Sequence, residues 1–273
     1  MDFIEAILLG ILQGITEFLP VSSSGHLVLA QALLERDIDR SITFEIVVHF
    51  GTLFSILIIF RERIRLLIIT IVRFLTDPRN MAVNWKNEYN VRFVFYVLLS
   101  MIPAMLVGFL LKDYVEAAFA SPVLTSSMLL VTGLLLYSTR FTTQNDQNVT
   151  AMKGFIIGVS QALAIMPGIS RAGTTITTGL FLRLKQTEVA DFSFIMLLPV
   201  LAGAMLLEIQ EIAGNGIESV AAAELTAAFF ASFISGVIAL KYLIKLLKGK
   251  SLHYFAWYCW FVGISGIIYF GFL

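Results

Sequence analysis

The sequence predicts an all-α protein, a polytopic bundle of membrane helices with an inverted-topology internal repeat and two broken, re-entrant helix pairs. Three observations support this fold class. Of the 273 residues, 58% are hydrophobic and only 14% are charged, whereas roughly a quarter of the residues of a soluble domain are charged. Several apolar stretches have about the 20 residues that a helix needs to cross the hydrocarbon core. Two further apolar regions are each broken near the middle by proline, glycine, serine and a charged residue.

Charge and cysteine content exclude several other classes of protein. The 19 basic residues balance the 19 acidic ones, so the chain has no global basic field with which to bind nucleic acid. A single cysteine, Cys259, cannot form an intramolecular disulfide. The first residues include Asp2 and Glu5 but no basic residue, unlike a cleaved secretory signal. We expect one integral membrane domain, 1–273, with repeats at about 1–141 and 151–273.

The candidate spans are apolar stretches of sufficient length: 42–60, 91–111, 122–138, 188–207, 222–247 and 254–273. The shorter stretch 64–75 is flanked or interrupted by arginines, which predicts an interfacial helix. The interrupted regions 3–34 and 152–182 each predict two half-helices that meet inside the membrane. Irregular backbone at that depth is tolerated only where protein or a wet cavity satisfies its hydrogen bonds.

The distribution of basic residues predicts the orientation in the membrane. Basic residues cluster in 61–92 and 241–250, whereas the loop 208–221 has three glutamates and no basic residue. One topology agrees with these charges. The basic clusters lie in the cytoplasm, both termini lie outside, and each broken pair returns to the side from which it started. Pairs that cross fully would give the same parity, so loop charge leaves that alternative open.

An offset of 148 residues superimposes one broken region on the other. The identical pairs are Gly10 with Gly158, Gln13 with Gln161, Ser22 with Ser170, Gly25 with Gly173 and Phe44 with Phe192. These identities cluster around the breaks, and each broken pair is followed by three long helices. An odd number of crossings in each half inverts the second half relative to the first. Inverted repeats with broken helices place a site near the midplane, between the halves.

The first break, QGITEFLPVSSSGH, carries an acid and then a run of serines that ends in a histidine. Ser22, Ser23, Ser24 and Gly25 lie at the start of a predicted helix, where free N–H groups and the helix dipole attract an anion. His26 follows Ser22 by four residues and Ser23 by three, so either hydroxyl could face it. A serine beside a histidine is the arrangement that activates a hydroxyl nucleophile.

The second break, MPGISRAGTT, has the same design but replaces the acid and the histidine with an arginine. The guanidinium of Arg171, with neighbouring hydroxyls and helix-end amides, is suited to bind a phosphate. The other residues expected to bind substrate here are Gly168, Ser170, Gly173, Thr174 and Thr175. The two breaks are chemically complementary, and we predict that they form one composite site.

Glu17 presents an electrostatic problem that predicts a cofactor. A charged residue at the bilayer centre costs roughly 2.5–3.5 kcal/mol, so we expect Glu17 and Arg171 to be paired, hydrated or both. A carboxylate repels a phosphate unless it is protonated or a cation lies between them. Gln13 lies four residues before Glu17, on the same helix face. We predict a divalent cation, Mg²⁺ or Ca²⁺, held by Glu17, the Gln13 amide oxygen and substrate oxygens.

Structural roles remain open for several of these residues. An interhelical hydrogen bond of Gln13 is as well supported as a role in a metal site. Helix capping is the default role of the serines, and Glu17 with Arg171 could be a structural ion pair that joins the halves. Intramembrane charge beside helix breaks more often marks function, however. The glycines at the helix contacts are expected to be close-packing positions: Gly10, Gly14, Gly158 and Gly179.

At these residues the sequence resembles the bacterial undecaprenyl-diphosphate phosphatases of the bacitracin-resistance type. The resemblance covers essentially the whole chain, and its most specific parts are QGITEFLPVSSSGH, the TFE run at Thr43 to Glu45, and PGISRAGTT. It implies a multi-pass enzyme of the bacterial inner membrane with a site open to the outer face. Such an enzyme removes the terminal phosphate of a long-chain isoprenyl diphosphate and so regenerates the lipid carrier for peptidoglycan precursors.

The resemblance also implies roles for individual residues. The family's acid motif falls on Gln13 and Glu17, and its serine and histidine fall on Ser23 and His26. Its PGxSRSxxT motif falls on 167–175, where Ala172 replaces the second serine, so no hydroxyl is available at that position. Gln13 stands where the family also uses glutamate, which removes one possible charge from the metal site.

We therefore predict phosphoryl transfer to water, with Arg171 and Ser170 binding the diphosphate. Ser23 attacks the terminal phosphorus and His26 serves as base and later as acid. In an alternative mechanism, His26 or Glu17 activates water directly.

The rival functional class is a transporter or flippase for an anionic lipid, because broken helices and inverted repeats are also transporter architecture. A nucleophile favours the enzyme, since translocation needs none. The oligomeric state is not determined, and a homodimer remains open.

Overall fold

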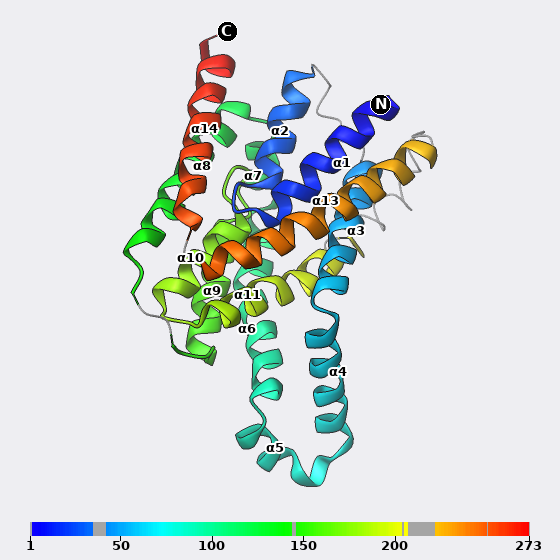
Figure 1. Ribbon diagram of the computed structural model, residues 1–273, viewed down its shortest axis with the longest axis vertical. Coiled ribbons are helices and arrows are strands. Elements are labelled where there is room, and N and C mark those ends of the chain that lie inside the picture. Colours follow the sequence, from blue (N-terminus) through cyan, green and yellow to red (C-terminus); the bar gives the residue numbers. More distant parts are fainter. Residues whose placement is uncertain are drawn as a thin grey trace.

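The computed structural model describes residues 2–34, 42–143, 146–203, 205–206, 222–249 and 251–272. Within these ranges the chain is helical apart from turns and one isolated bridge, between Gln147 and Leu184, so the predicted all-α bundle is confirmed (Figure 1). The helices are α1 (Phe3–Phe18), α2 (Ser23–Leu33), α3 (Ile42–Ile59), α4 (Arg61–Thr76), α5 (Met81–Asn87), α6 (Tyr89–Leu110), α7 (Lys112–Phe119), α8 (Pro122–Ser138), α9 (Ala151–Leu163), α10 (Arg171–Phe181), α11 (Gln186–Ile195), α13 (Ala222–Lys248) and α14 (Phe255–Phe272). Single-turn helices lie at η1 (Pro78–Asn80), η2 (Thr139–Phe141) and η3 (Leu252–Tyr254).

The part of the chain that the structure describes contains four segments that are long and apolar enough to cross a membrane. They are Tyr89–Leu110, Pro122–Phe141, Ala222–Lys248 and Leu252–Phe272, and each coincides with a predicted span. The predicted span 42–60 is present as α3, but it is bent by 78° relative to α4, so that the two helices form a broken span or a re-entrant segment. The protein is therefore a multi-pass membrane protein.

The predicted span 188–207 lies only partly within the described residues, and its crossing of the membrane stays a prediction. Helix α11 ends at Ile195 and a turn follows at Met196, before further helical residues at 197–203 and 205–206. Pro199 explains the break, because it lacks the N–H that would bond to the carbonyl of Ile195 four residues earlier. The loop 208–221, on which part of the orientation rests, lies outside the described residues.

The predicted interfacial helix 64–75 corresponds to α4. After the bend, α4 leads out of the bundle, and α4, α5 and α6 form a hairpin that projects at the bottom of the view (Figure 1). Its location relative to the membrane surface stays a prediction. Both chain termini lie at the opposite end of the molecule from this hairpin.

Both predicted broken helix pairs are present, and their boundaries follow the offset of 148 residues. The offset carries Phe3 at the start of α1 onto Ala151 at the start of α9, and it carries both ends of α2 onto the ends of α10. The outer ends of the second pair lie together. Gln147 N donates to the Arg183 carbonyl over 3.0 Å, and Lys185 N donates to the Gln147 carbonyl over 2.9 Å. This pair therefore returns to the side from which it starts.

Glycines allow the broken pairs to pack closely on their neighbours. A Cβ at Gly14 of α1 would lie 2.3 Å from the Ser232 carbonyl oxygen of α13, and one at Gly158 of α9 would lie 2.2 Å from the Ser100 carbonyl oxygen of α6. Neither position tolerates a side chain at the observed distance. The predicted close-packing role of these glycines is confirmed, and it brings each break next to a long helix.

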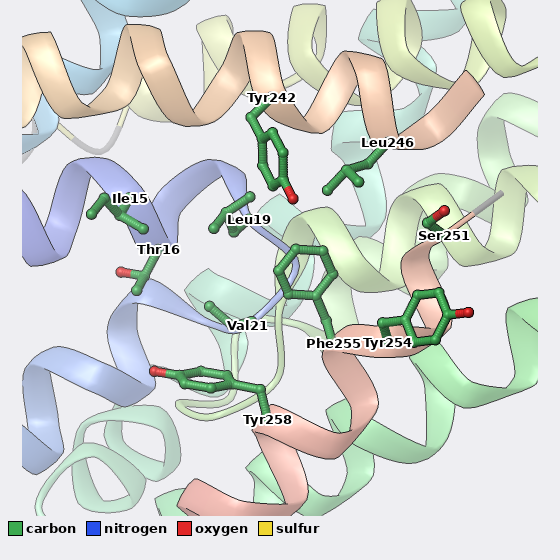
Figure 2. Close-up of a pocket in the computed structure, with 10 residues that line it drawn as sticks. All are labelled: Ile15, Thr16, Leu19, Val21, Tyr242, Leu246, Ser251, Tyr254, Phe255 and Tyr258. Atoms are coloured by element: carbon green, nitrogen blue, oxygen red, sulfur yellow. The ribbon is translucent and has the colours of Figure 1, made fainter. Parts of the chain in front are cut away.

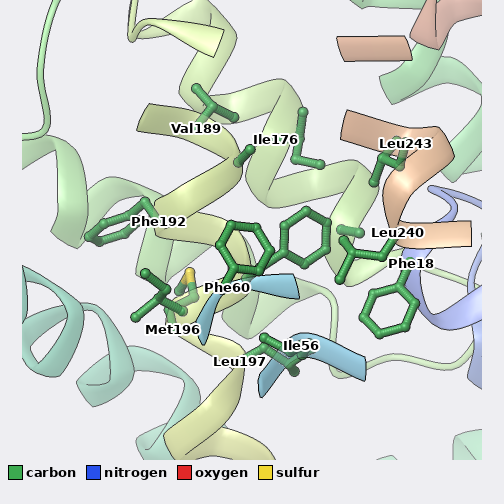
Figure 3. Packing of buried hydrophobic residues seen from close by; sticks show 14 of the residues in the cluster. Phe18, Ile56, Phe60, Ile176, Val189, Phe192, Met196, Leu197, Leu240 and Leu243 are labelled. Atoms are coloured by element: carbon green, nitrogen blue, oxygen red, sulfur yellow. The ribbon is translucent and has the colours of Figure 1, made fainter. Parts of the chain in front are cut away.

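The main hydrophobic core joins the two halves beneath the breaks. Figure 3 shows Phe18, Phe60, Ile176 and Leu240 converging from α1, the α3–α4 bend, α10 and α13. The ring of Phe194, on α11, packs edge-on against Phe18 at 6.0 Å and lies 5.7 Å from the ring of Phe60. The core therefore holds the end of α1 against α11. This contact positions Glu17, the residue before Phe18.

Candidate functional site

The two chain breaks meet in the interior, and their charged residues form an ion pair. Arg171 Nη2 lies 3.1 Å from Glu17 Oε1, and the two side chains are only 14% and 8% exposed. Glu17 lies in the last turn of α1, and Arg171 is the first residue of α10. A Cβ at Gly25 would lie 2.9 Å from the Cα of Gly168, so the backbones of the breaks also touch. The predicted convergence of the two breaks is confirmed.

The Glu17 carboxylate is the centre of the polar network. Its Oε2 accepts hydrogen bonds from Ser23 Oγ at 2.6 Å and from Gln13 Nε2 at 3.1 Å, while Oε1 accepts from Arg171. A hydroxyl that donates to a carboxylate forms a short, strong hydrogen bond. The Ser23 proton therefore points at a group that can accept it during nucleophilic attack.

Arg171 is held from two further directions. Its Nη1 donates to the Ser193 carbonyl at 3.1 Å, and its guanidinium carbon lies 5.9 Å above the ring of Phe194. Thr175, one turn later in α10, shares a 2.6 Å hydrogen bond with the Ser193 hydroxyl. These contacts orient the guanidinium while using only part of the five N–H donors that it has. Donors remain for an anion.

Each half also supplies a helix N-terminus beside the ion pair. Ser22 caps α2, because its Oγ accepts from Gly25 N at 3.2 Å, and Ser170 caps α10, because its Oγ accepts from Gly173 N at 3.0 Å. The default capping role is therefore observed for both serines. Ser24 lies with its Oγ 3.3 Å from the Ser22 Oγ. The uncapped first-turn amides carry the partial positive charge of the helix dipole.

Gly168 is required by the backbone of the second break. Its φ is +92°, in the left-handed region that favours glycine, and a Cβ there would lie 2.2 Å from the Thr125 carbonyl oxygen. Thr132 of α8 donates to the Gly168 carbonyl at 2.7 Å and accepts from Ser170 N at 3.0 Å. The hydroxyl of Thr174 is used inside α10, where it donates to the Ser170 carbonyl at 2.8 Å. These residues fix the backbone of the second break at the start of α10.

The predicted contact between His26 and a serine hydroxyl is wrong. His26 Nδ1 lies 2.8 Å from the Ser22 carbonyl oxygen, and Nε2 lies 2.8 Å from the hydroxyl of Tyr258, whose ring stacks on the imidazole at 4°. In a neutral imidazole, Nδ1 therefore donates and Nε2 accepts the Tyr258 proton. Glu17 takes the place beside Ser23 that was expected of His26. The catalytic role of His26 stays a prediction.

Two contact residues of the site were missed by the sequence analysis. Tyr258 lies 232 residues from His26, and no local pattern indicated it. Ser193 had a signal, because the offset of 148 residues places it opposite Glu45 of the TFE run. The repeat could therefore have pointed to the segment that holds Arg171.

Gln13 and Glu17 are the residues expected to hold a cation. No group of three or more His, Cys, Asp or Glu side chains is arranged to hold a metal ion in the described ranges. Gln13 is fully buried, and its Oε1 has no hydrogen-bond partner among the residues described. A buried amide oxygen beside a carboxylate fits a hard cation whose other ligands are water and substrate oxygens. The residues thus fit a cation shared with the substrate, in place of a preformed protein cage.

The chain is similar to known proteins along almost its whole length. A family model described as "Bacitracin resistance protein BacA" matches residues 6–265. The undecaprenyl-diphosphatase of Salinibacter ruber is 38% identical over 268 residues, which cover 98% of this chain and 99% of the relative. Those of Desulforapulum autotrophicum and Bacteroides fragilis are each 39% identical, over 277 and 272 residues, and the matches cover 98% of both chains. The matched range includes both breaks.

Proposed function

Since the chain belongs to the bacitracin-resistance protein BacA family, we propose that it hydrolyses undecaprenyl diphosphate to undecaprenyl phosphate and inorganic phosphate. The observation that carries this proposal is the cluster of Glu17, Ser23 and Arg171 at the meeting of the breaks. A guanidinium and two helix N-termini bind a diphosphate. A transporter needs the same anion site, but it has no use for a serine hydroxyl bonded to a carboxylate.

The geometry supports a covalent mechanism in which Glu17 serves as the base. Ser23 Oγ attacks the terminal phosphorus as its proton passes to Glu17 Oε2. The bond from phosphorus to the bridging oxygen breaks, and undecaprenyl phosphate leaves with the electron pair of that bond. Water then hydrolyses the phosphoserine. Glu17 returns its proton to Ser23 Oγ, and the inorganic phosphate retains the oxygen and protons of the water.

Arg171 and a cation share the task of offsetting negative charge. The guanidinium binds the terminal phosphate through the donors that Glu17 and Ser193 leave free. We propose that Glu17 and the Gln13 amide oxygen would hold Mg²⁺ or Ca²⁺, and the bound ion would supply positive charge to offset that of the phosphate oxygens. Gln13 Oε1, which has no hydrogen-bond partner among the described residues, supports this site.

We propose that the protein lies in the bacterial inner membrane with both termini and the entrance to the site on the outer side. Both termini lie at one end of the molecule, and the α4–α6 hairpin lies at the other. The stretch 61–92, which forms most of this hairpin, carries seven basic residues. Positively charged loops remain in the cytoplasm, which orients the hairpin inward.

Phosphate release from undecaprenyl diphosphate by the purified protein tests the function, with and without a chelator of divalent cations. We expect phosphate release that the chelator suppresses.

Ser23→Ala and Arg171→Ala should each lower turnover roughly a thousandfold, because both groups act in the transition state. Ser127→Ala is the matched control, since its hydroxyl bonds within α8 to the Val123 carbonyl. No release with any cation would favour a carrier, and near-normal turnover of Ser23→Ala would exclude the phosphoserine.

A further inference from the structure

Helix α11 holds the guanidinium of Arg171 through two contacts that carry no charge of their own. The Ser193 carbonyl accepts from Arg171 Nη1 at 3.1 Å, and the ring of Phe194 lies 5.9 Å from the guanidinium carbon. A guanidinium is planar and presents its donors in a fixed fork. The direction of the donors that remain for an anion therefore depends on where α11 lies.

The first part of α11 carries two carboxylates that bind the α4–α6 hairpin. Asp191 Oδ2 lies 3.0 Å from Arg63 Nε of α4, and Glu188 Oε2 accepts from the Tyr89 hydroxyl of α6 at 2.5 Å. The Arg63 and Asp191 side chains are only 20% and 28% exposed. Asp191 precedes Phe194 by three residues, which is about 4.5 Å along a helix axis. A shift of this part of α11 therefore reaches the guanidinium almost undiminished.

The hairpin partners of these carboxylates are themselves held in place. Arg63 Nη1 donates to Asn90 Oδ1 at 2.8 Å, and its guanidinium carbon lies 4.8 Å from the centre of the Phe93 ring. The Tyr89 hydroxyl also accepts from Val149 N at 3.1 Å. We call the five polar side chains of this network the polar clamp: Arg63, Tyr89, Asn90, Glu188 and Asp191. It joins α4, α6 and the segment before α9 to α11.

Orientation explains the polar clamp better than stability does. A partly buried ion pair adds little net stability, because the loss of hydration offsets most of the attraction. The side chains of Phe192 and Phe194 are fully buried in the core and already hold α11 against the bundle. The clamp adds directional contacts to a helix that apolar burial alone would retain.

Apolar contacts define the direction of a planar group only loosely, because they are non-directional. They dominate on one side of the first break. Figure 2 shows Leu19 and Val21 of that break across a pocket from Phe255 and Tyr258 of α14, in a lining composed mainly of aliphatic and aromatic side chains. The charged contacts of the polar clamp reach α11 instead, which is the helix that orients the guanidinium.

We propose that Asp191 and Glu188 are positioning residues for Arg171, and that the α4–α6 hairpin thereby contributes to binding of the diphosphate. The inference rests on the proposed function. The carboxylates fix α11, and α11 orients the guanidinium through Ser193 and Phe194. The guanidinium then binds the phosphate, so the polar clamp acts on the substrate only through Arg171.

A double-mutant cycle tests this proposal. Asp191→Asn removes the charge that pairs with Arg63 and keeps the size of the side chain. We expect kcat/KM for undecaprenyl diphosphate to fall about tenfold, since misplacing a catalytic group by a fraction of an ångström has effects of this order. In an Arg171→Lys background, Asp191→Asn should have no further effect, because an ammonium is a point charge without a planar fork. The same loss in both backgrounds, or no loss in either, overturns the proposal.

Two further variants separate positioning from general damage to the fold. Tyr89→Phe removes only the hydroxyl that bonds to Glu188, and it should lower kcat/KM severalfold in the native background and not in Arg171→Lys. Glu116→Gln is the matched control, because its carboxylate belongs to an exposed ion pair with Lys112 on α7. Its kcat/KM should not change. Equal kcat/KM in Tyr89→Phe and Glu116→Gln overturns the role of Glu188.

A binding measurement separates failure of the positioning role from failure of the enzymatic function. Calorimetric titration of the purified protein with inorganic diphosphate reports anion affinity without turnover of the lipid. Asp191→Asn should weaken this affinity severalfold, and only where Arg171 is present. That result in a protein that releases no phosphate from undecaprenyl diphosphate would support the positioning role and refute the phosphatase. Phosphate release by the native protein, with the same affinity and the same kcat/KM in Asp191→Asn, would refute the positioning role and leave the phosphatase standing.

Discussion

At the scale of single residues, the acceptor strength of Glu17 determines how the site is arranged. Hydrogen bonds to a charged group contribute roughly 1.5–3 kcal/mol, against about 1 kcal/mol between neutral groups. The Ser23 hydroxyl accordingly bonds to Glu17, although its spacing in the sequence also permits a contact with His26. Helical spacing identifies residues on one face, but it does not rank partners that arrive from other helices.

Tyr258→Phe tests whether Tyr258 positions His26. The substitution keeps the stacked ring, and it removes only the hydroxyl bonded to Nε2. We expect kcat/KM for phosphate release to fall roughly tenfold, since an orphaned buried acceptor costs about 1–3 kcal/mol. A double-mutant cycle with His26→Gln should show that the two effects are not additive. Equal kcat/KM in Tyr258→Phe and in the exposed control Tyr269→Phe would contradict the positioning role.

At the scale of helices, the sequence predicts what local residues determine and misses what distant helices determine. The breaks at 19–22 and 164–170 follow from proline, glycine and serine, and the offset of 148 residues predicts the boundaries of α10 from those of α2. Pro199 is a local signal for the end of α11 at Ile195. The chain bends between α3 and α4 at Phe60, where no proline or glycine is present. Phe60 packs on Phe194 of α11, and α4 packs on α6, and spacing along the chain cannot indicate these contacts.

Gly158→Ala tests the packing of the second broken pair. The added methyl would meet the Ser100 carbonyl at 2.2 Å, so α9 must move away from α6, and overpacking of this kind costs about 1–3 kcal/mol. We expect a lower midpoint of thermal unfolding in detergent and reduced phosphate release, because α9 leads into the break. Gly108→Ala in α6 is the control, since no atom of the described residues lies within 4 Å of its added Cβ. Equal loss of stability in both variants would contradict the close-packing role.

At the scale of the whole molecule, the ion pair joins the halves in the orientation that helix dipoles disfavour. Glu17 lies in the last turn of α1, where the dipole is negative, and Arg171 opens α10, where it is positive. Each charge would be stabilised by roughly 0.3–1 kcal/mol at the opposite kind of terminus. A pair selected only to hold the halves together would be expected in the reverse arrangement. The observed arrangement instead places the carboxylate beside Ser23 and the guanidinium at the N-terminus of α10.

Reversing the pair separates its structural role from its chemical role. Glu17→Ala or Arg171→Ala alone leaves an uncompensated buried charge, which costs about 3–5 kcal/mol of stability, so a loss of activity in these variants has two explanations. The double variant Glu17→Arg with Arg171→Glu restores a pair and places both charges at favourable helix ends. We expect its unfolding midpoint to lie above those of both single variants, while phosphate release stays at their level. Ser23 would then face a guanidinium that cannot accept its proton, and a carboxylate would repel the diphosphate. Recovery of activity together with stability would show that the pair serves only to join the halves.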